Sequence, residues 1–153
     1  MRVPVAAPLV ISVLLSVPAP AQEGTAASVA DPTLAKQLGA DERGMRNYVL
    51  AILKTGPHRV PDGPARDEVF AGHFANIKRL AAAGKLVVAG PFRDKGDWRG
   101  ILLFAVETHE EAEKLVATDP VIQSGEMVAE YHGLYATAAL MSVTSIHEKI
   151  APP

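Results

Sequence analysis

Residues 65–92 read ARDEVFAGHFANIKRLAAAGKLVVAGPF, and the spacing of the apolar residues changes within this stretch. The first part repeats at the spacing of an amphipathic helix, and the last part is a short apolar run that a Gly-Pro pair closes. Gly84 lies between the two parts, where a helix commonly ends. The stretch therefore predicts a helix over residues 65–83 that leads directly into a strand over residues 85–92.

A histidine interrupts the apolar face of this predicted helix. Four residues follow the spacing of one buried helical face: Phe70, Phe74, Ile77 and Ala81. His73 projects from the same face, because it follows the first of them by three residues. A histidine in such a place is either a core residue with a satisfied hydrogen bond or a functional group beside a pocket. The second interpretation requires a partner elsewhere in the chain.

The rest of the chain after residue 44 alternates between predicted strands and helices. Three further apolar or alternating runs are predicted as strands, over residues 47–53, 98–107 and 126–136. A capping box formed by Thr108 and Glu111 predicts a second helix that ends near residue 118. The resulting order, β-α-β-β-α-β, is the ferredoxin-like arrangement of an α+β subunit with an antiparallel sheet.

Two of the predicted strands are apolar on both faces. Residues 101–106 read ILLFAV without any polar alternation, and residues 47–53 are equally apolar. Two helices can cover one face of the sheet, but little chain is left to cover the other face. We therefore expect a homodimer in which the sheets of two copies pack together.

The N-terminal segment has the composition of a secretory signal peptide. Arg2 precedes an apolar run that is too short to span a bilayer, and small residues flank Pro20 where a signal peptidase would read them. Cleavage after Ala21 predicts a periplasmic or secreted protein with no membrane segment in the mature chain; an uncleaved anchor is the alternative. The sequence divides into four predicted parts: a signal peptide (residues 1–21), a lead-in with a short helix (22–44), one domain (45–137) and a C-terminal tail (138–153).

Composition argues against several kinds of site. The chain has 153 residues, a formal net charge of −2 and no cysteine. It therefore has neither disulfides nor a thiol nucleophile, and its mild acidity without a basic cluster argues against nucleic acid as a partner. The five histidines are scattered without an HxH or HExxH motif, which gives a metal site little support. We expect no cofactor.

Three segments together carry a resemblance to a known family. They read GHFANIKRLAAAGKLVVAGPF, RGILLFAVETHEEAEKLVATDPVIQSG and EMVAEYHGLYA, over residues 72–92, 99–125 and 126–136. With these segments, residues 45–137 resemble the YCII-related (YciI-like) family. The resemblance implies a ferredoxin-like subunit that forms a dimeric α+β barrel with a second copy. It also implies an active site built on a His–Asp pair, which falls on His73 and Asp119.

The other candidate residues each have a structural interpretation beside the functional one. Asp119 precedes a proline, as in the N-cap of a short helix, but one carboxylate oxygen can cap the helix while the other accepts from an imidazole. Gly90 and Pro91 either open space beside the site or only end a strand. Glu130 and His132 share one face of the last strand, and they either line the same cavity or face solvent.

Three classes of function are compatible with these residues. The first is a lyase- or isomerase-type enzyme in which His73 and Asp119 transfer a proton on a small molecule. The second is a non-catalytic dimeric barrel that binds a small ligand. The third is a metal or haem site on His73, which has the least support because no further ligands stand at sensible spacing. No motif specifies a substrate.

Overall fold

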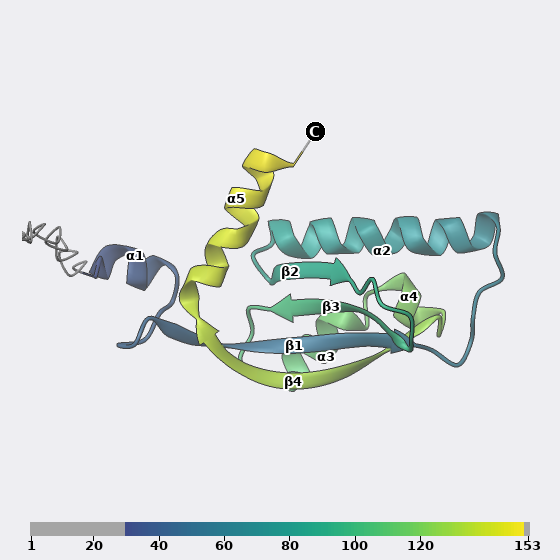
Figure 1. The fold of residues 1–153 in the computed structure, drawn as a ribbon, viewed down its shortest axis with the longest axis horizontal. Helices are drawn as coiled ribbons and strands as arrows, with labels where there is room; N and C mark the ends of the chain where they lie inside the picture. The colour runs from purple at the N-terminus through teal and green to yellow at the C-terminus, as the bar shows by residue number, and fades with distance from the viewer. Residues whose placement is uncertain (1–29, 152–153) are drawn as a thin grey trace, which may run out of the picture.

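The computed structural model describes residues 30–151, so the predicted signal peptide lies outside the described residues. Four strands form one antiparallel sheet in the order β2-β3-β1-β4 (Figure 1). The strands are β1 (Met45–Thr55), β2 (Leu86–Pro91), β3 (Trp98–Phe104) and β4 (Met127–Thr137). This sheet, with its helices, confirms the predicted ferredoxin-like α+β class.

The helices connect the strands in the predicted places. They are α1 (Pro32–Gln37), α2 (Pro64–Ala82), α3 (His109–Val116), α4 (Pro120–Gln123), the 3-10 helix η1 (Ala138–Ser142) and α5 (Val143–Ile150). Gly84 ends α2 with a φ of 65°, a left-handed conformation that glycine adopts without strain. In the described part of the chain, no helix is both long enough and apolar enough to cross a bilayer.

The main hydrophobic core lies between one face of the sheet and helices α2, α3 and α4. Strand residues at alternate positions, such as Val49, Ala51 and Phe104, pack there against Leu80 of α2 and Val116 of α3. All five of these residues are buried. The same packing places the C-terminal end of α3 and the start of α4 beside the middle of α2, where the candidate site forms.

The buried face of α2 differs from the predicted one. Phe74 was expected on that face, but it is 58% exposed, whereas His73, Asn76 and Leu80 are buried. The prediction was wrong for Phe74 and right for Phe70 and Ile77, which pack against the core. His73, which was also predicted on this face, and Asn76 obtain a buried hydrogen-bond partner from the α3–α4 connection. The histidine therefore lies deeper than the neighbouring phenylalanine.

The second face of the sheet is partly covered by the C-terminal tail. Residues 138–150, within the predicted C-terminal tail, form η1 and α5 after the end of β4 (Figure 1). Tyr48, Val87 and Leu103 pack against this segment in a second core cluster. Val128 and Leu134 on β4 stay exposed. The prediction that too little chain remains to cover this face is therefore wrong for the part that η1 and α5 cover.

Candidate functional site

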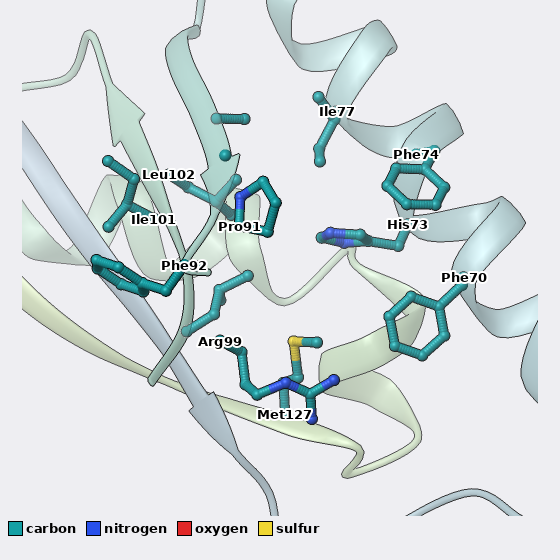
Figure 2. Close-up of a pocket in the computed structure, with 14 residues that line it drawn as sticks. Phe70, His73, Phe74, Ile77, Pro91, Phe92, Arg99, Ile101, Leu102 and Met127 are labelled. Atoms are coloured by element: carbon teal, nitrogen blue, oxygen red, sulfur yellow. The ribbon is translucent and has the colours of Figure 1, made fainter. Parts of the chain in front are cut away.

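A cavity of about 440 Å³ opens between α2 and the strands β2 and β3 (Figure 2). Phenylalanine, proline, leucine, isoleucine and methionine side chains form most of its wall. His73 and Arg99 are the two side chains with ionisable groups that line it. An apolar cavity with a small number of polar groups is the usual form of a small-molecule site.

His73 lies within hydrogen-bonding distance of Asp119. The His73 Nδ1 atom is 2.8 Å from the Asp119 Oδ2 atom, and the two residues are 8% and 1% exposed. Because an ionised carboxylate can only accept, the imidazole donates from Nδ1, which leaves the Nε2 lone pair of a neutral ring free. Among the described residues, none forms a hydrogen bond with Nε2. The ring is thus oriented by a carboxylate and contributes to the cavity wall.

Asp119 has the structural role as well as the contact with histidine. Its Oδ1 atom accepts a hydrogen bond from the Val121 backbone N–H at 3.1 Å and so caps α4. Its Oδ2 atom accepts from His73 and, at 3.4 Å, from the Asn76 amide. Each carboxylate oxygen therefore has its own partners, and one residue makes both the helix cap and the contact with His73.

Close packing between α2 and α4 brings the pair together. A Cβ atom on Gly72 would lie 2.8 Å from the Pro120 Cγ atom, so a larger residue there would force the two helices apart. The rings of Phe70 and Phe74 flank the imidazole, with centroids 6.2 and 5.5 Å away. The glycine directly before His73 is a sequence signal of this close approach, and it did not enter the prediction of the site.

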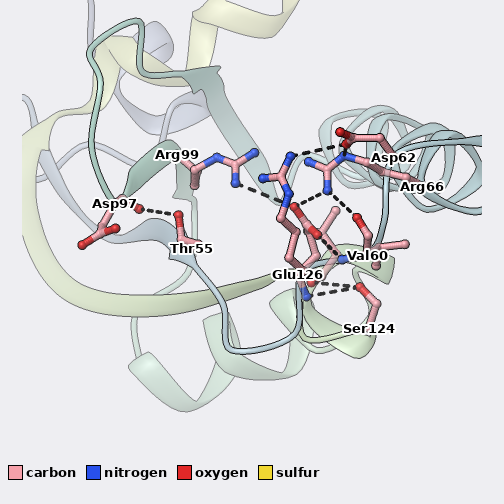
Figure 3. Close-up of polar contacts among 10 residues, drawn as sticks. Thr55, Val60, Asp62, Arg66, Asp97, Arg99, Ser124 and Glu126 are labelled. Atoms are coloured by element: carbon pink, nitrogen blue, oxygen red, sulfur yellow. Dashed lines mark hydrogen bonds and ion pairs between the residues drawn. The ribbon is translucent and has the colours of Figure 1, made fainter.

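Glu126 is a buried carboxylate beside the site that sequence reasoning did not single out. It is 1% exposed, and its Oε2 atom accepts from the Val60 backbone N–H at 2.7 Å (Figure 3). Its Oε1 atom accepts from Arg66 at 2.6 Å and lies 3.7 Å from the Arg99 guanidinium. Burial raises the pKa of Glu126, but the hydrogen bonds from Val60 and Arg66 outweigh it, so the net pKa is below its ordinary value.

Comparison with known proteins agrees with this architecture. Residues 45–132, more than half of the chain, match the model of the YCII-related domain family. The chain belongs to the YCII-related family. The match begins at the first residue of β1 and ends within β4, so the YCII-related domain contains the whole sheet apart from the last residues of β4.

One solved structure similar to this YCII-related chain is 5-chloro-2-hydroxyhydroquinone dehydrochlorinase (TftG) from Burkholderia phenoliruptrix AC1100, in complex with 2,5-dihydroxybenzoquinone. The sequence identity is 23% and the TM-score is 0.42. The similarity covers 57% of this chain and 91% of that chain. The search of curated proteins gave no match.

The predicted pocket residues of the YCII-related domain divide between the two faces of the sheet. Gly90 and Pro91 line the cavity. Of the two alternatives for Glu130 and His132, lining the same cavity or facing solvent, the structure agrees with the second, since neither residue lines the cavity and both are about half exposed. They lie on the opposite face of β4, where His132 Nε2 is 2.8 Å from Glu130, and Lys54 is 2.9 Å from the same carboxylate.

The described part of the YCII-related chain offers no ready metal centre. Within residues 30–151, no three His, Asp or Glu side chains are grouped so that they could hold an ion. The polar groups nearest to His73 are already committed, since Asp119 caps a helix and Asn76 donates to Asp119. The ionisable side chains at or beside the cavity are those of His73, Asp119, Glu126 and Arg99.

Proposed function

We propose that this protein is a small-molecule enzyme of lyase or isomerase type, in which the His73–Asp119 pair transfers a proton. The observation that carries the proposal is the 2.8 Å contact between Nδ1 and Oδ2, in a residue that lines an apolar cavity. A carboxylate on one ring nitrogen orients the imidazole and fixes its tautomer, so the other ring nitrogen can act as a general base.

The proposed reaction begins with proton abstraction by His73. The Nε2 lone pair takes a proton from a carbon next to a carbonyl group, the C–H electron pair forms a C=C bond, and the carbonyl π pair moves to oxygen. Asp119 then faces an imidazolium, whose charge it balances. Return of the proton to another carbon completes an isomerisation. Departure of a group from the β carbon with its bonding pair completes an elimination.

A non-catalytic ligand-binding domain is the alternative function. The mostly apolar wall of the cavity favours it, because such a wall binds a small molecule whether or not a proton moves. Under this alternative, the contact between His73 and Asp119 only orders the wall.

Deuterium incorporation from solvent tests the proposal with a panel of compounds in place of one identified substrate. The full chain is incubated in D₂O with small lactones and ketones, and proton NMR follows the loss of each C–H signal beside a carbonyl group. Exchange faster than in buffer alone supports the enzyme. Binding of panel compounds without exchange supports the binding domain, and neither binding nor exchange contradicts both.

We also propose that the protein is a homodimer that uses the partly covered face of the sheet. Val128 and Leu134 are exposed there, next to the ion-paired Lys54 and Glu130. Light scattering should give about twice the monomer mass at micromolar concentration, because burial of this apolar surface would stabilise the pair. Val128→Lys should shift the mass to that of a monomer, whereas Ala82→Lys, on α2, should not. A wild-type monomer would contradict the proposal.

Export to the periplasm or outside the cell is a further part of the proposed function. The signal-peptide pattern predicts that bacterial expression yields a mature N-terminus at Gln22. Mass spectrometry of the intact purified protein measures this directly. A bulky residue at the cleavage position, in Ala21→Phe, should retain the precursor. Protein recovered from the cytoplasm with Met1 still present would contradict export.

A further inference from the structure

We propose that Arg99 is an anion-binding residue of the His73 cavity, and that the ligand is a small carboxylate with an apolar carbon skeleton. The inference rests on the proposed function in one respect, the use of this cavity, and it does not depend on proton transfer. It comes from the charge balance around Glu126, from the position of Arg99 in the wall and from the apolar character of the remaining wall.

The arginines beside Glu126 outnumber the buried carboxylates. Arg66 and Arg99 both approach the Oε1 atom of Glu126, at 2.6 and 3.7 Å, and the other carboxylate oxygen accepts from the Val60 N–H (Figure 3). The exposed Asp62 adds a second carboxylate, but it pairs with Arg59 as well as with Arg66, at 3.4 Å from each. Three guanidinium groups therefore face two carboxylates, and one positive charge is left over at this edge of the cavity.

Arg66 is satisfied by its own partners. Besides Glu126, it donates to the Val60 carbonyl at 3.1 Å, pairs with Asp62 at 3.4 Å and lies over the ring of Phe70, 4.7 Å from the centroid. The unbalanced group is therefore Arg99. Among the described residues its guanidinium has the 3.7 Å ion pair with Glu126 and no side-chain hydrogen bond.

Arg99 lies where a ligand could reach it. Its side chain is three-quarters buried, and it lines the same cavity as His73, from the strand side rather than the helix side (Figure 2). Since the effective dielectric of such a wall is low, a ligand anion would interact with this guanidinium more strongly than in water. A guanidinium presents paired N–H donors that match the two oxygens of a carboxylate.

The rest of the wall specifies the body of the ligand. Phe70, Pro91 and Met127 supply apolar surface to the same cavity wall as His73 and Arg99. A small carboxylate bound at Arg99 would place its carbon skeleton against these residues. This is a recognition role: Arg99 selects and holds the ligand, and Glu126 is a positioning residue for Arg99.

A matched pair of probes tests the assignment. Benzoate and benzamide have nearly the same size and ring, but benzoate alone carries a charge. NMR titration of the full chain should give an apparent Kd about tenfold lower for benzoate than for benzamide. Arg99→Gln should abolish this preference, and Arg99→Lys should retain part of it. Arg93→Gln, at an exposed arginine in the β2–β3 connection, should leave it unchanged.

The outcomes separate this proposal from the proposed function. Retention of the tenfold preference in Arg99→Gln would overturn it, and so would the absence of benzoate binding to wild type in the millimolar range. His73→Asn reports on the other residue, since an imidazolium could also attract an anion. If His73→Asn keeps the preference for benzoate over benzamide, the result supports Arg99 even if no proton transfer is found. If the preference is lost in His73→Asn but kept in Arg99→Gln, the result refutes the proposal. Unchanged thermal unfolding of Arg99→Lys shows that the comparison concerns the folded protein.

Discussion

Replacement of Glu126 by glutamine should lower the free energy of unfolding by about 3 kcal/mol, the scale seen when one partner of a buried ion pair is removed. The side chain is fully buried, and Arg66, which donates to it at 2.6 Å, is mostly buried too. Glutamine keeps the size and can still accept from the Val60 N–H, so the loss reports on charge rather than packing. Without the carboxylate, the Arg66 guanidinium keeps only the exposed Asp62 as a counter-charge.

Glu110→Gln provides a control at an exposed ion pair on α3. Glu110 pairs with Lys114 at 2.7 Å, but about three-quarters of its side chain is exposed. Exposed ion pairs contribute little, so this variant should leave the free energy of unfolding close to that of wild type. Urea unfolding followed by circular dichroism measures both variants. Equal losses would show that the Glu126 charge is unimportant.

The same carboxylate should give the protein an acid-sensitive contribution to stability. Hydrogen bonds hold the folded-state pKa of Glu126 below its ordinary value of 4.5. A group with a depressed pKa in the folded state stabilises fully above its ordinary pKa and loses that contribution as the pH falls through the folded-state pKa. Below about pH 4.5, the unfolding free energy of wild type should therefore fall more steeply than that of Glu126→Gln. Parallel curves would contradict this assignment.

The strands and the two main helices could be predicted because their signals are local. Thr108 caps α3 and Gly84 ends α2 through contacts with residues a few positions away, and the sequence displays both. Asp119 before a proline is another local signal, since the cap it forms involves the next two residues. The resemblance to the family then paired Asp119 with His73.

The Arg99–Glu126 side of the site could not be predicted in the same way. Glu126 contacts Val60 and Arg66, which are 66 and 60 residues away along the chain. In the sequence, Glu126 only continues the alternation of the last strand, which is typical of a solvated face. Its burial depends on the loop before α2, whose conformation no periodic pattern encodes.

The prediction for β4 was correct about which residues share a face of the strand, but it could not say which face meets the helices. The sequence correctly placed Glu130 and His132 on one face of the strand together, since alternation fixes which residues share a face. Alternation does not say which face meets the helices. The structure turns Met127 toward the core and so sends Glu130 and His132 to the other side. The tail was missed because its two short helices span too few turns for a period.

Replacement of His73 by asparagine should lower the deuterium exchange of a reactive compound by about 10²- to 10⁴-fold, the usual contribution of a positioned general base. Asparagine can still donate to the Asp119 Oδ2 atom, so the free energy of unfolding should change by no more than about 1 kcal/mol. His109→Asn, at an exposed histidine on α3, is the control and should leave both measurements unchanged. Proton NMR gives the exchange rate and urea unfolding gives the stability.

Asp119→Asn should lower exchange comparably while retaining the helix cap, because asparagine is as good an N-cap as aspartate. If its amide oxygen keeps the Val121 N–H, its amide nitrogen must face His73 Nδ1. A donor at that position makes Nδ1 the acceptor and moves the ring proton to Nε2, where it removes the lone pair that faces the cavity. Nitrogen NMR of the imidazole should show this change of tautomer. A loss of about 1–3 kcal/mol in both variants, with exchange unaltered, would instead assign the pair a purely structural role, as an orphaned buried partner requires.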